Sequence, residues 1–522
     1  MMSVTKDDVV KLAASVGFCI PDSEVEDYAT LLDHAKASFE AIQAMDDYQP
    51  VPDITAAPRK DVFLPAKSDN PLGAWAYRCT CTHSNPESSL LKDKTFCLKD
   101  NIAMAGVPCL LGTDTFTGWV PKTDATVVAR ILTHGGTIAG KAVCENLSRG
   151  AVSNTAASGP VDNPYAKGYS AGGSSSGTAA LVADGAVDMG IGCDQGGSVR
   201  IPASLCGLYG FKATTGLVPY TGTASNDASV DYVGPITKTV LDCATLLEAI
   251  AGVDGLDDRQ IAGVPFPSDV PKYSELVRSM DLTAGLKGIT IGILKEGLEP
   301  PTMDAAVKEK FLAATEVLKN LGAEVREISV PIHTQSRAIY TVLSKMSNHV
   351  GMLGRASGRR QVALTDLFEK KALPYNQDVI AKMNFTSKEG LLSGELGWTG
   401  YPLAYPKAVN LNRKLKDMYD QALQEVDYLV MPTTVTPSNP YPDPAAPPLE
   451  QSNASAGKLE NTCAFNGSGH PALAMPIGMV PSQEDNELKL PASMQIVGRY
   501  WDEVGILKVA YAWETKQDWK KS

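Results

Sequence analysis

The sequence contains few histidines and few aromatic residues, and it lacks a long uninterrupted apolar segment. Only 6 of its 522 residues are histidine, and neither they nor the cysteines show the spacing of a metal site. We therefore expect neither a metal ion nor a cofactor. No apolar stretch approaches the ~18 residues that a membrane-spanning helix requires, so we expect no membrane association.

Runs of lysine or arginine are also absent. The chain has 47 basic and 59 acidic residues, a net charge of −12. This balance disfavours nucleic acid as a partner, because phosphate binding needs a basic face. The first residues, 1–18, are polar and amphipathic and do not resemble a secretory signal. We therefore expect a cytoplasmic protein whose 10 cysteines are reduced thiols.

Helical and strand patterns alternate along most of the chain. Residues 6–46 are predicted to be helical, and the proline-containing residues 47–73 form a connecting strap. Residues 288–294 (GITIGIL) are typical of a buried strand, and residues 304–321 of an amphipathic helix. This alternation predicts an α/β layer structure. Residues 334–410 are less regular and are expected to be mostly helical.

Two glycine-serine clusters, at residues 172–177 and 196–198, stand in an otherwise apolar region. Flexible linkers would not be flanked by residues that look buried. Glycines in a packed region allow unusual backbone angles and close backbone approach. N–H groups exposed on such turns can stabilise an oxyanion, and a helix beginning near Val199 would add its positive end.

Three other motif matches are weaker. Gly168–Gly172 fits the G-x-S-x-G nucleophile elbow around Ser170, but residues 161–167 look like a polar turn, not the strand that this motif requires. Residues 135–141 resemble a P-loop without its magnesium-binding Ser or Thr. Residues 455–458 match S-x-x-K without companion motifs. We therefore favour the glycine-serine clusters as the site.

A serine-rich site needs a base, and Lys99 is the candidate. It directly follows the apolar run 94–98, so its side chain is expected to point into the fold. A buried lysine loses its proton easily, because desolvation disfavours the charged form. Most lysines are exposed, and the alternative is a charged structural lysine paired with a carboxylate such as Asp100.

Four ordered segments resemble those of the amidase signature family of serine hydrolases. They are residues 98–113, 124–147, 172–219 and 490–510. Within that family the chain is most similar to the enantioselective amidases of nitrile-degrading bacteria. This closer likeness is carried by residues 157–161, 193–198, 216–222 and 469–471.

The resemblance implies the fold. Length alone would suggest three or four domains, but the family implies a single α/β/α domain around a large mixed β-sheet of about eleven strands. We accordingly assign residues 1–73 to an N-terminal helical segment with its strap, and residues 74–522 to the amidase signature domain. Residues 334–410 are interpreted as a variable insertion that shapes the substrate site.

The resemblance also implies a Ser–cis-Ser–Lys triad. By position, Ser198 is the nucleophile, Ser174 the bridging serine and Lys99 the base. The peptide bond between Gly173 and Ser174 is expected to be cis, and Ser175 to support the triad by hydrogen bonding.

The oxyanion hole is expected next to the nucleophile. The backbone N–H groups of Gln195, Gly196, Gly197 and Ser198 are its predicted donors. Asp194 and Arg200 flank this turn, and we interpret both as structural. The loop of residues 150–157 is expected to wall the acyl site.

The predicted function is a serine amidohydrolase. It would convert small or medium aliphatic or aryl amides to the carboxylic acid plus ammonia or amine, through an acyl-enzyme on Ser198. The alternative is the glutaminase component of a tRNA-dependent amidotransferase, which needs a partner protein. The third hypothesis is a catalytically silent binding scaffold, which the filled triad positions disfavour. The expected partners are a small-molecule amide and a second copy in a homodimer.

Overall fold

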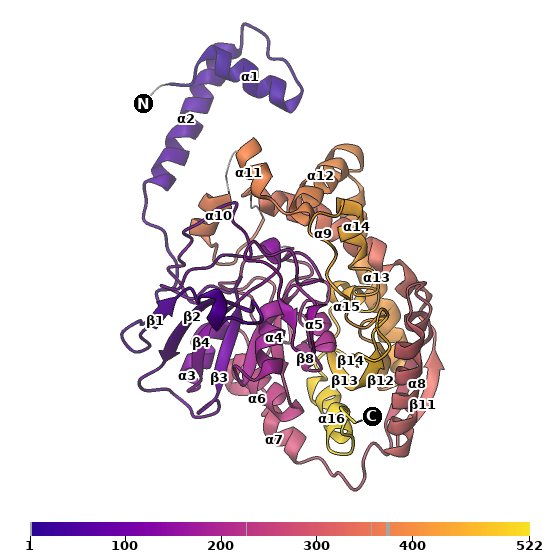
Figure 1. Cartoon of the computed structure of the whole chain (residues 1–522). Coiled ribbons are helices and arrows are strands. Elements are labelled where there is room, and N and C mark those ends of the chain that lie inside the picture. Colours follow the sequence, from indigo (N-terminus) through magenta and orange to yellow (C-terminus); the bar gives the residue numbers. More distant parts are fainter. Residues whose placement is uncertain (1–2, 226, 356–357, 372–375, 522) are drawn as a thin grey trace. The chain divides into compact units, whose positions relative to one another are not determined.

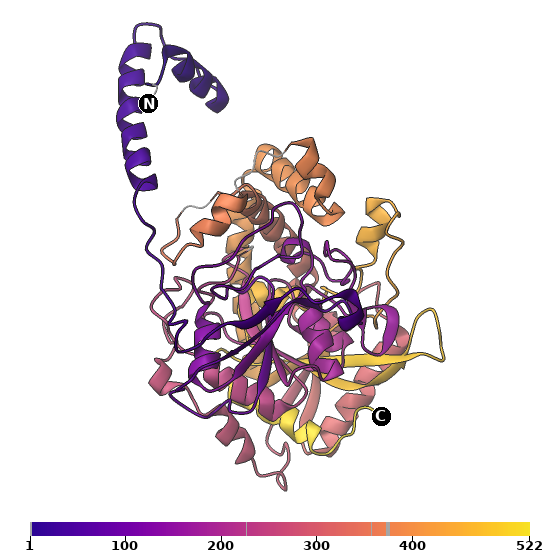
Figure 2. The same ribbon diagram turned by 60° about the vertical axis from the view of Figure 1, so that its left-hand side comes forward.

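The computed structural model describes residues 3–225, 227–355, 358–371 and 376–521. It divides the chain into two compact units, residues 1–50 and 51–522. The first unit holds two helices, α1 (Lys6–Val16) and α2 (Val25–Gln43), which a short connection joins (Figure 2). Thr5 caps α1 by accepting a hydrogen bond from Asp8 N, and Gly17 ends it with a left-handed φ of 92°.

The strap differs from the boundary that we expected at residue 73. Its residues from 51 onward belong to the second unit, and it contributes β1 (Lys60–Phe63), which pairs antiparallel with β2 (Trp75–Thr82). Backbone hydrogen bonding to the sheet therefore fixes part of a segment that its prolines made look like a linker.

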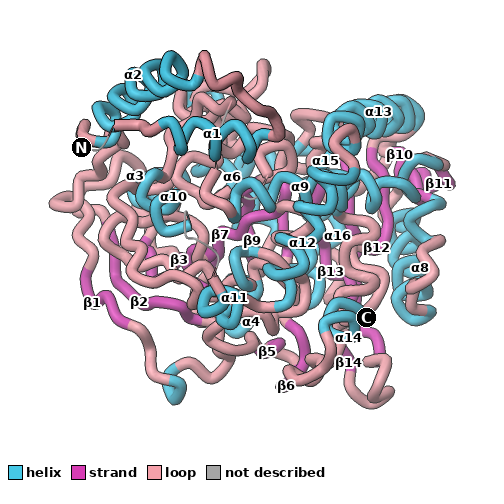
Figure 3. The backbone as a smooth tube through the Cα atoms, turned by 90° about the horizontal axis from the view of Figure 1, so that it is seen from above, coloured by secondary structure: helices cyan, strands magenta, loops and turns pink. Residues whose placement is uncertain are grey.

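Within the described residues, the second unit is built on a twelve-stranded mixed sheet, one strand more than the resemblance implied. Figure 3 shows the strands crossing the domain from β1 and β2 to β10 and β11. The remaining strands, in sheet order after β2, are β4 (Thr137–Ala142), β3 (Thr95–Lys99), β7 (Met189–Asp194), β9 (Tyr232–Thr237), β8 (Tyr209–Lys212), β13 (Ala472–Pro481), β14 (Lys489–Val497), β12 (Tyr428–Pro432), β10 (Thr290–Leu294) and β11 (Glu324–Ile328). Two short strands, β5 (Asp162–Asn163) and β6 (Ala166–Ser170), pair separately.

Helices cover both faces of the sheet (Figure 1), so the expected α/β/α architecture is confirmed. One face packs against α3 (Thr126–Thr133), α6 (Val240–Ile250), α7 (Tyr273–Arg278), α8 (Ala305–Asn320) and α16 (Glu503–Glu514). The other face packs against α4 (Ser176–Asp184), α5 (Arg200–Leu205), α13 (Ala404–Glu425) and α15 (Cys463–Ser468).

The region 334–410 is mostly helical, as expected. It contains α9 (Ser336–Met352), α10 (Thr365–Lys371), α11 (Gln377–Lys382), α12 (Phe385–Gly400) and the start of α13. Its α9 packs against α12, α13 and α15. Elsewhere in the sequence, α14 (Pro448–Asn453) follows the proline-rich loop after β12. None of the helices in the described ranges is both long and apolar enough to cross a membrane.

The alternation of side chains along β3 decides where Lys99 points. Phe96 and Leu98 enter the core on the α3 and α6 face, whereas Cys97 packs with α4 on the opposite face. Lys99, two residues after Cys97, therefore lies on the α4 side. In the neighbouring β7, a Cβ added at Gly192 would lie 2.9 Å from Ser175 Oγ, so glycine allows the start of α4 to approach the sheet closely.

Candidate active site

Lys99 is fully buried and contacts Ser174. Its Nζ lies 2.7 Å from Ser174 Oγ and 3.3 Å from the carbonyl oxygen of Cys193. Burial lowers the pKa of the Lys99 ammonium below its usual range. The lowered pKa makes the neutral amine, the state that a general base requires, more accessible than it is for an exposed lysine.

The alternative of a structural pair between Lys99 and Asp100 is wrong. Asp100 lies 3.3 Å from Nζ of another buried lysine, Lys141, on β4. Its carboxylate also accepts hydrogen bonds from the backbone N–H groups of Leu110 and Leu111. Strand β3 ends at Lys99, and the contacts of Asp100 in the turn that follows are with Lys141, Leu110 and Leu111, not with Lys99.

The two serines that begin α4 are anchored to the neighbouring strand. The peptide bond between Gly173 and Ser174 is cis, as the resemblance implied. Ser175 Oγ donates to the Cys193 carbonyl and accepts from the Cys193 N–H, each at 3.2 Å. Ser175 thus fastens the turn to the same residue of β7 that Lys99 contacts, and its role in supporting the triad stays a prediction.

Ser198 lies at the edge of a cavity of about 190 Å³. Its side chain is nearly buried, with 9% exposure. Among the described residues, no hydrogen bond joins Ser198 to Ser174. The structure therefore links the candidate base to the bridging serine, and it places the candidate nucleophile where a ligand in the cavity can reach it.

The turn before Ser198 corrects one predicted donor of the oxyanion hole. The N–H of Gly197 donates to Asp194 Oδ1 at 2.7 Å, so it is already engaged within the protein. Gln195, Gly196 and Ser198 remain as candidate backbone donors. Gly197 has a φ of 131°, and a Cβ there would clash with Thr462, so this position requires glycine.

The turn is held by a buried ion pair between Asp194 and Arg200. The guanidinium contacts both carboxylate oxygens, at 3.0 Å and 2.9 Å, and neither residue is exposed. Burial alone would raise the pKa of Asp194, but the charge of Arg200 outweighs it and lowers that pKa to about 2. Arg200 also donates to Asn466 and Gln495. Both residues therefore act within the scaffold of the turn, as we interpreted them.

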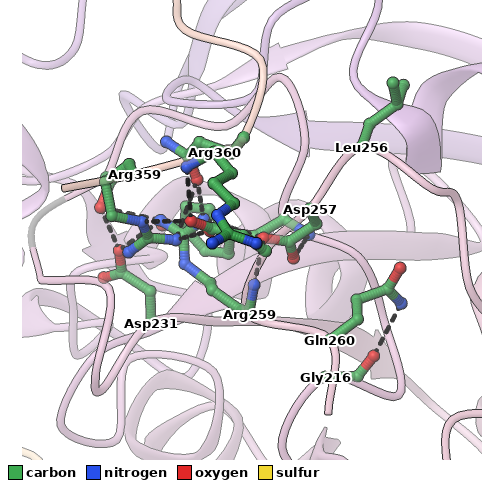
Figure 4. Close-up of polar contacts among 12 residues, drawn as sticks. Gly216, Asp231, Leu256, Asp257, Arg259, Gln260, Arg359 and Arg360 are labelled. Atoms are coloured by element: carbon green, nitrogen blue, oxygen red, sulfur yellow. Dashed lines mark hydrogen bonds and ion pairs between the residues drawn. The ribbon is translucent and has the colours of Figure 1, made fainter. Parts of the chain in front are cut away.

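A side-chain network continues outward from Gln195. Its Nε2 donates to the hydroxyl of Tyr220 at 2.9 Å, and the guanidinium of Arg259 lies 4.5 Å from the centre of the Tyr220 ring. Figure 4 shows Arg259 between Asp231 and Asp257, with ion-pair distances of 3.4 Å and 3.1 Å. These contacts therefore hold the side chain of Gln195, whose backbone N–H is one of the candidate oxyanion donors.

The cavity wall combines the expected loop with residues that sequence reasoning did not identify. Loop residues 150–152, 154 and 155 line it. From the helical region 334–410, the lining residues are Arg337, Tyr340, Thr341, Ser344, Lys345, Asn348, Phe385, Thr386 and Glu389. These residues form no compact motif, because they come from different turns of α9 and α12. A second cavity of about 740 Å³ shares Asp227 with the first.

The nucleophile-elbow match requires a correction. Residues 166–170 form strand β6, so our objection that no strand precedes Ser170 was wrong. The hydroxyl of Ser170 nevertheless accepts a hydrogen bond from Gly172 N, at 2.9 Å. Among the described residues, neither a histidine nor a lysine bonds to it, so the geometry supplies no base for this serine.

Comparison with known proteins identifies the family. A family model described as Amidase matches residues 74–507, and the chain belongs to this family. An enantioselective amidase from Rhodococcus rhodochrous is 35% identical over 467 residues, covering 87% of this chain and 85% of that protein. The chain is accordingly an amidase, a hydrolase that acts on amide C–N bonds.

Two further relatives define the range of the similarity. One subunit of the glutamyl-tRNA(Gln) amidotransferase from Caldanaerobacter subterraneus subsp. tengcongensis is 31% identical over 432 residues, covering 82% of this chain and 84% of that protein. The solved structure of native peptide amidase from Stenotrophomonas maltophilia matches with a TM-score of 0.66 and 27% identity, over 82% of this chain and 83% of that one. Family membership therefore leaves the amide substrate open.

The buried ion pair leads to a stability prediction. Arg200→Met leaves the carboxylate of Asp194 buried and unpaired, so we expect the free energy of unfolding to fall by about 3–5 kcal/mol. Urea denaturation followed by circular dichroism measures this loss. The double variant Asp194→Asn/Arg200→Met removes both charges and should lose less than the sum of the two single variants. A loss below about 1 kcal/mol for Arg200→Met would contradict the structural role.

Proposed function

We propose that this amidase hydrolyses small or medium aliphatic or aryl carboxamides through an acyl-enzyme on Ser198. The observation that carries the proposal is the 2.7 Å contact between buried Lys99 and Ser174, and Ser198, the candidate nucleophile, lines the cavity. A neutral amine, a bridging hydroxyl and a second hydroxyl together form a proton path that needs no histidine.

The proposed reaction moves one proton along this path. Lys99 takes the proton of Ser174, and Ser174 takes the proton of Ser198 as Ser198 Oγ attacks the amide carbon. Collapse of the tetrahedral intermediate breaks the C–N bond, and the proton returns to the departing nitrogen. Water then attacks the acyl-enzyme and passes its proton along the same path to Lys99. As the second tetrahedral intermediate collapses, the bond from the acyl carbon to Ser198 Oγ breaks, that proton returns to Ser198, and the carboxylic acid leaves.

The developing oxyanion needs fixed donors. We propose that the backbone N–H groups of Gln195, Gly196 and Ser198 provide them, since that of Gly197 is bonded to Asp194. Donors held rigidly in a site with little water stabilise such a charge far better than mobile water does. The ion pair of Asp194 with Arg200 supports this rigidity from behind the turn.

The alternative function is the glutaminase component of an amidotransferase, which the 31% identical relative supports. The 35% identity to an enantioselective amidase favours the free-standing enzyme. The test assays the purified chain with a primary aliphatic amide, an anilide and glutamine, and measures the release of ammonia or amine. We expect turnover of an amide without a partner. Glutamine hydrolysis that appears only with a partner protein would instead establish the alternative.

Ser198 should be the residue that forms the acyl-enzyme. A fluorophosphonate probe is expected to label Ser198, because it lines the cavity and has backbone donors beside it. Mass spectrometry of the digested protein identifies the labelled residue. Ser198→Ala should lose the label and at least about 100-fold in kcat, whereas Ser170→Ala should keep the label. Labelling at Ser170 would refute the proposed nucleophile.

Lys99 should set the acidic limb of the pH–rate profile. Its neutral form is the base, so kcat falls as pH drops through its pKa. Burial lowers this pKa, so activity extends to lower pH than an ordinary lysine allows. Lys99→Arg keeps the charge but cannot act as the base, and should reduce kcat roughly 100- to 10,000-fold. The exposed Lys167→Arg is the matched control. A Lys99→Arg enzyme with near-normal kcat would remove lysine from the proton path.

We also propose that the chain forms a homodimer through its N-terminal helices. Tyr28, Leu31, Phe39 and Ile42 of α2 are between 42% and 68% exposed, and their spacing places them on one helix face. Light scattering of the full chain should give a dimer mass, and Phe39→Glu with Ile42→Glu should give a monomer. A wild-type chain that is monomeric at tens of micromolar contradicts this proposal.

A further inference from the structure

Arg149 lines the same cavity as Ser198. Its guanidinium has no carboxylate as an ion-pair partner among the described residues. The side chain is half-buried, and its hydrogen bond goes to the sulfur of Met352, at 3.0 Å. A thioether is a weak acceptor for a cation. Among the described residues, no carboxylate lies within ion-pair distance of the guanidinium. A half-buried arginine normally has such a partner, because desolvating an unpaired charge is costly.

The loop that carries Arg149 is held firmly in place. Glu145 is fully buried, and its carboxylate accepts hydrogen bonds from the N–H groups of Val152, Ser153 and Thr155 at 2.6–2.9 Å. Leu147 and Ser148, just before Arg149, have φ values of 49° and 60°. Residues with side chains rarely adopt this left-handed region, and a loop keeps them there only when its surroundings require it.

The helix opposite this loop leaves room for the guanidinium. A Cβ at Gly390, on α12, would collide with the guanidinium nitrogens of Arg149. Glu389, the adjacent carboxylate, is already paired with Lys345. Asp227, the remaining carboxylate of the cavity wall, accepts from Ser229 and forms no ion pair with Arg149. The charge of Glu389 acts on Arg149 from beyond ion-pair distance, so no carboxylate among the described residues pairs directly with this cation in the cavity.

We propose that Arg149 binds a carboxylate on the acyl part of the substrate, so that this amidase prefers monoamides of dicarboxylic acids. This proposal rests on the proposed acyl-enzyme at Ser198 and names the substrate class of that site. A guanidinium offers two parallel N–H donors that match a carboxylate, and such charge-assisted hydrogen bonds strengthen where water is excluded. An anionic acyl chain between Ser198 and Arg149 would supply the missing counter-charge.

The test compares two amides of equal chain length. Glutaramate ends in a carboxylate, and pentanamide ends in a methyl group. We expect the ratio of their kcat/KM values to favour glutaramate for the wild-type enzyme and to fall roughly 10- to 100-fold in Arg149→Met. Arg149→Lys should give an intermediate ratio, because it keeps the charge but not the paired donors. Arg278→Met, which removes an exposed charge on α7, should leave the ratio unchanged.

A binding measurement separates this proposal from the proposed function. Calorimetric titration of Ser198→Ala with glutaramate should show binding that is roughly 10- to 100-fold weaker when Arg149→Met is added. If neither amide is hydrolysed, the proposed acyl-enzyme fails, and the titration still decides the carboxylate site. A wild-type ratio that favours pentanamide, or equal glutaramate affinity with and without Arg149, overturns the carboxylate site.

Discussion

The buried amine of Lys99 is the constraint on which the site depends. An ammonium with no exposure to water is unstable unless a counter-charge lies beside it. The groups that contact Lys99 Nζ are a hydroxyl and a backbone carbonyl, which are neutral. Burial therefore lowers the pKa of Lys99, and the packing of β3, β7 and the start of α4 keeps this nitrogen out of contact with water.

Lys141 shows how strongly the surroundings decide the chemistry of a buried lysine. It lies on β4, next to β3 in the sheet, and it is as buried as Lys99. Burial would lower its pKa, but Cys109 and Asp100 beside it raise that pKa above its usual range. Lys141 thus stays a structural cation, while the neighbouring strand carries the candidate base, Lys99. The strand register separates them, because Lys141 pairs with Leu98, whose side chain points to the face opposite that of Lys99.

Two firmly bonded acidic residues shape the rest of the site. Asp194 fixes the turn before Ser198 through Arg200 and the N–H of Gly197. Glu145 fixes the loop around Val152 and Ser153, which forms part of the cavity wall. Each carboxylate loses its contacts with water on burial and gains several hydrogen bonds, which offset the free-energy cost of burying the charge. Helices α9 and α12 of the region 334–410 supply another part of the cavity wall.

Short-range patterns in the sequence were sufficient for the α/β architecture and for most of the helices and strands that we predicted, whereas the candidate triad came from the family resemblance. The periodicity of apolar residues indicates which face of an element is buried, and the glycine-serine clusters indicate close backbone approach. Both features can be predicted without a tertiary structure. The strand at residues 166–170 was missed, because it is polar and pairs with the short strand β5 and with residues 439–441, far away in sequence. The role of Gly197 N–H was also misassigned, because the sequence does not show which acceptor a backbone N–H will bond to.

The tertiary structure alone decided that Lys99 contacts Ser174 and not Asp100, and that Arg149 faces the cavity without a carboxylate. Such contacts join residues far apart in sequence, and only packing determines which of many possible partners a side chain meets.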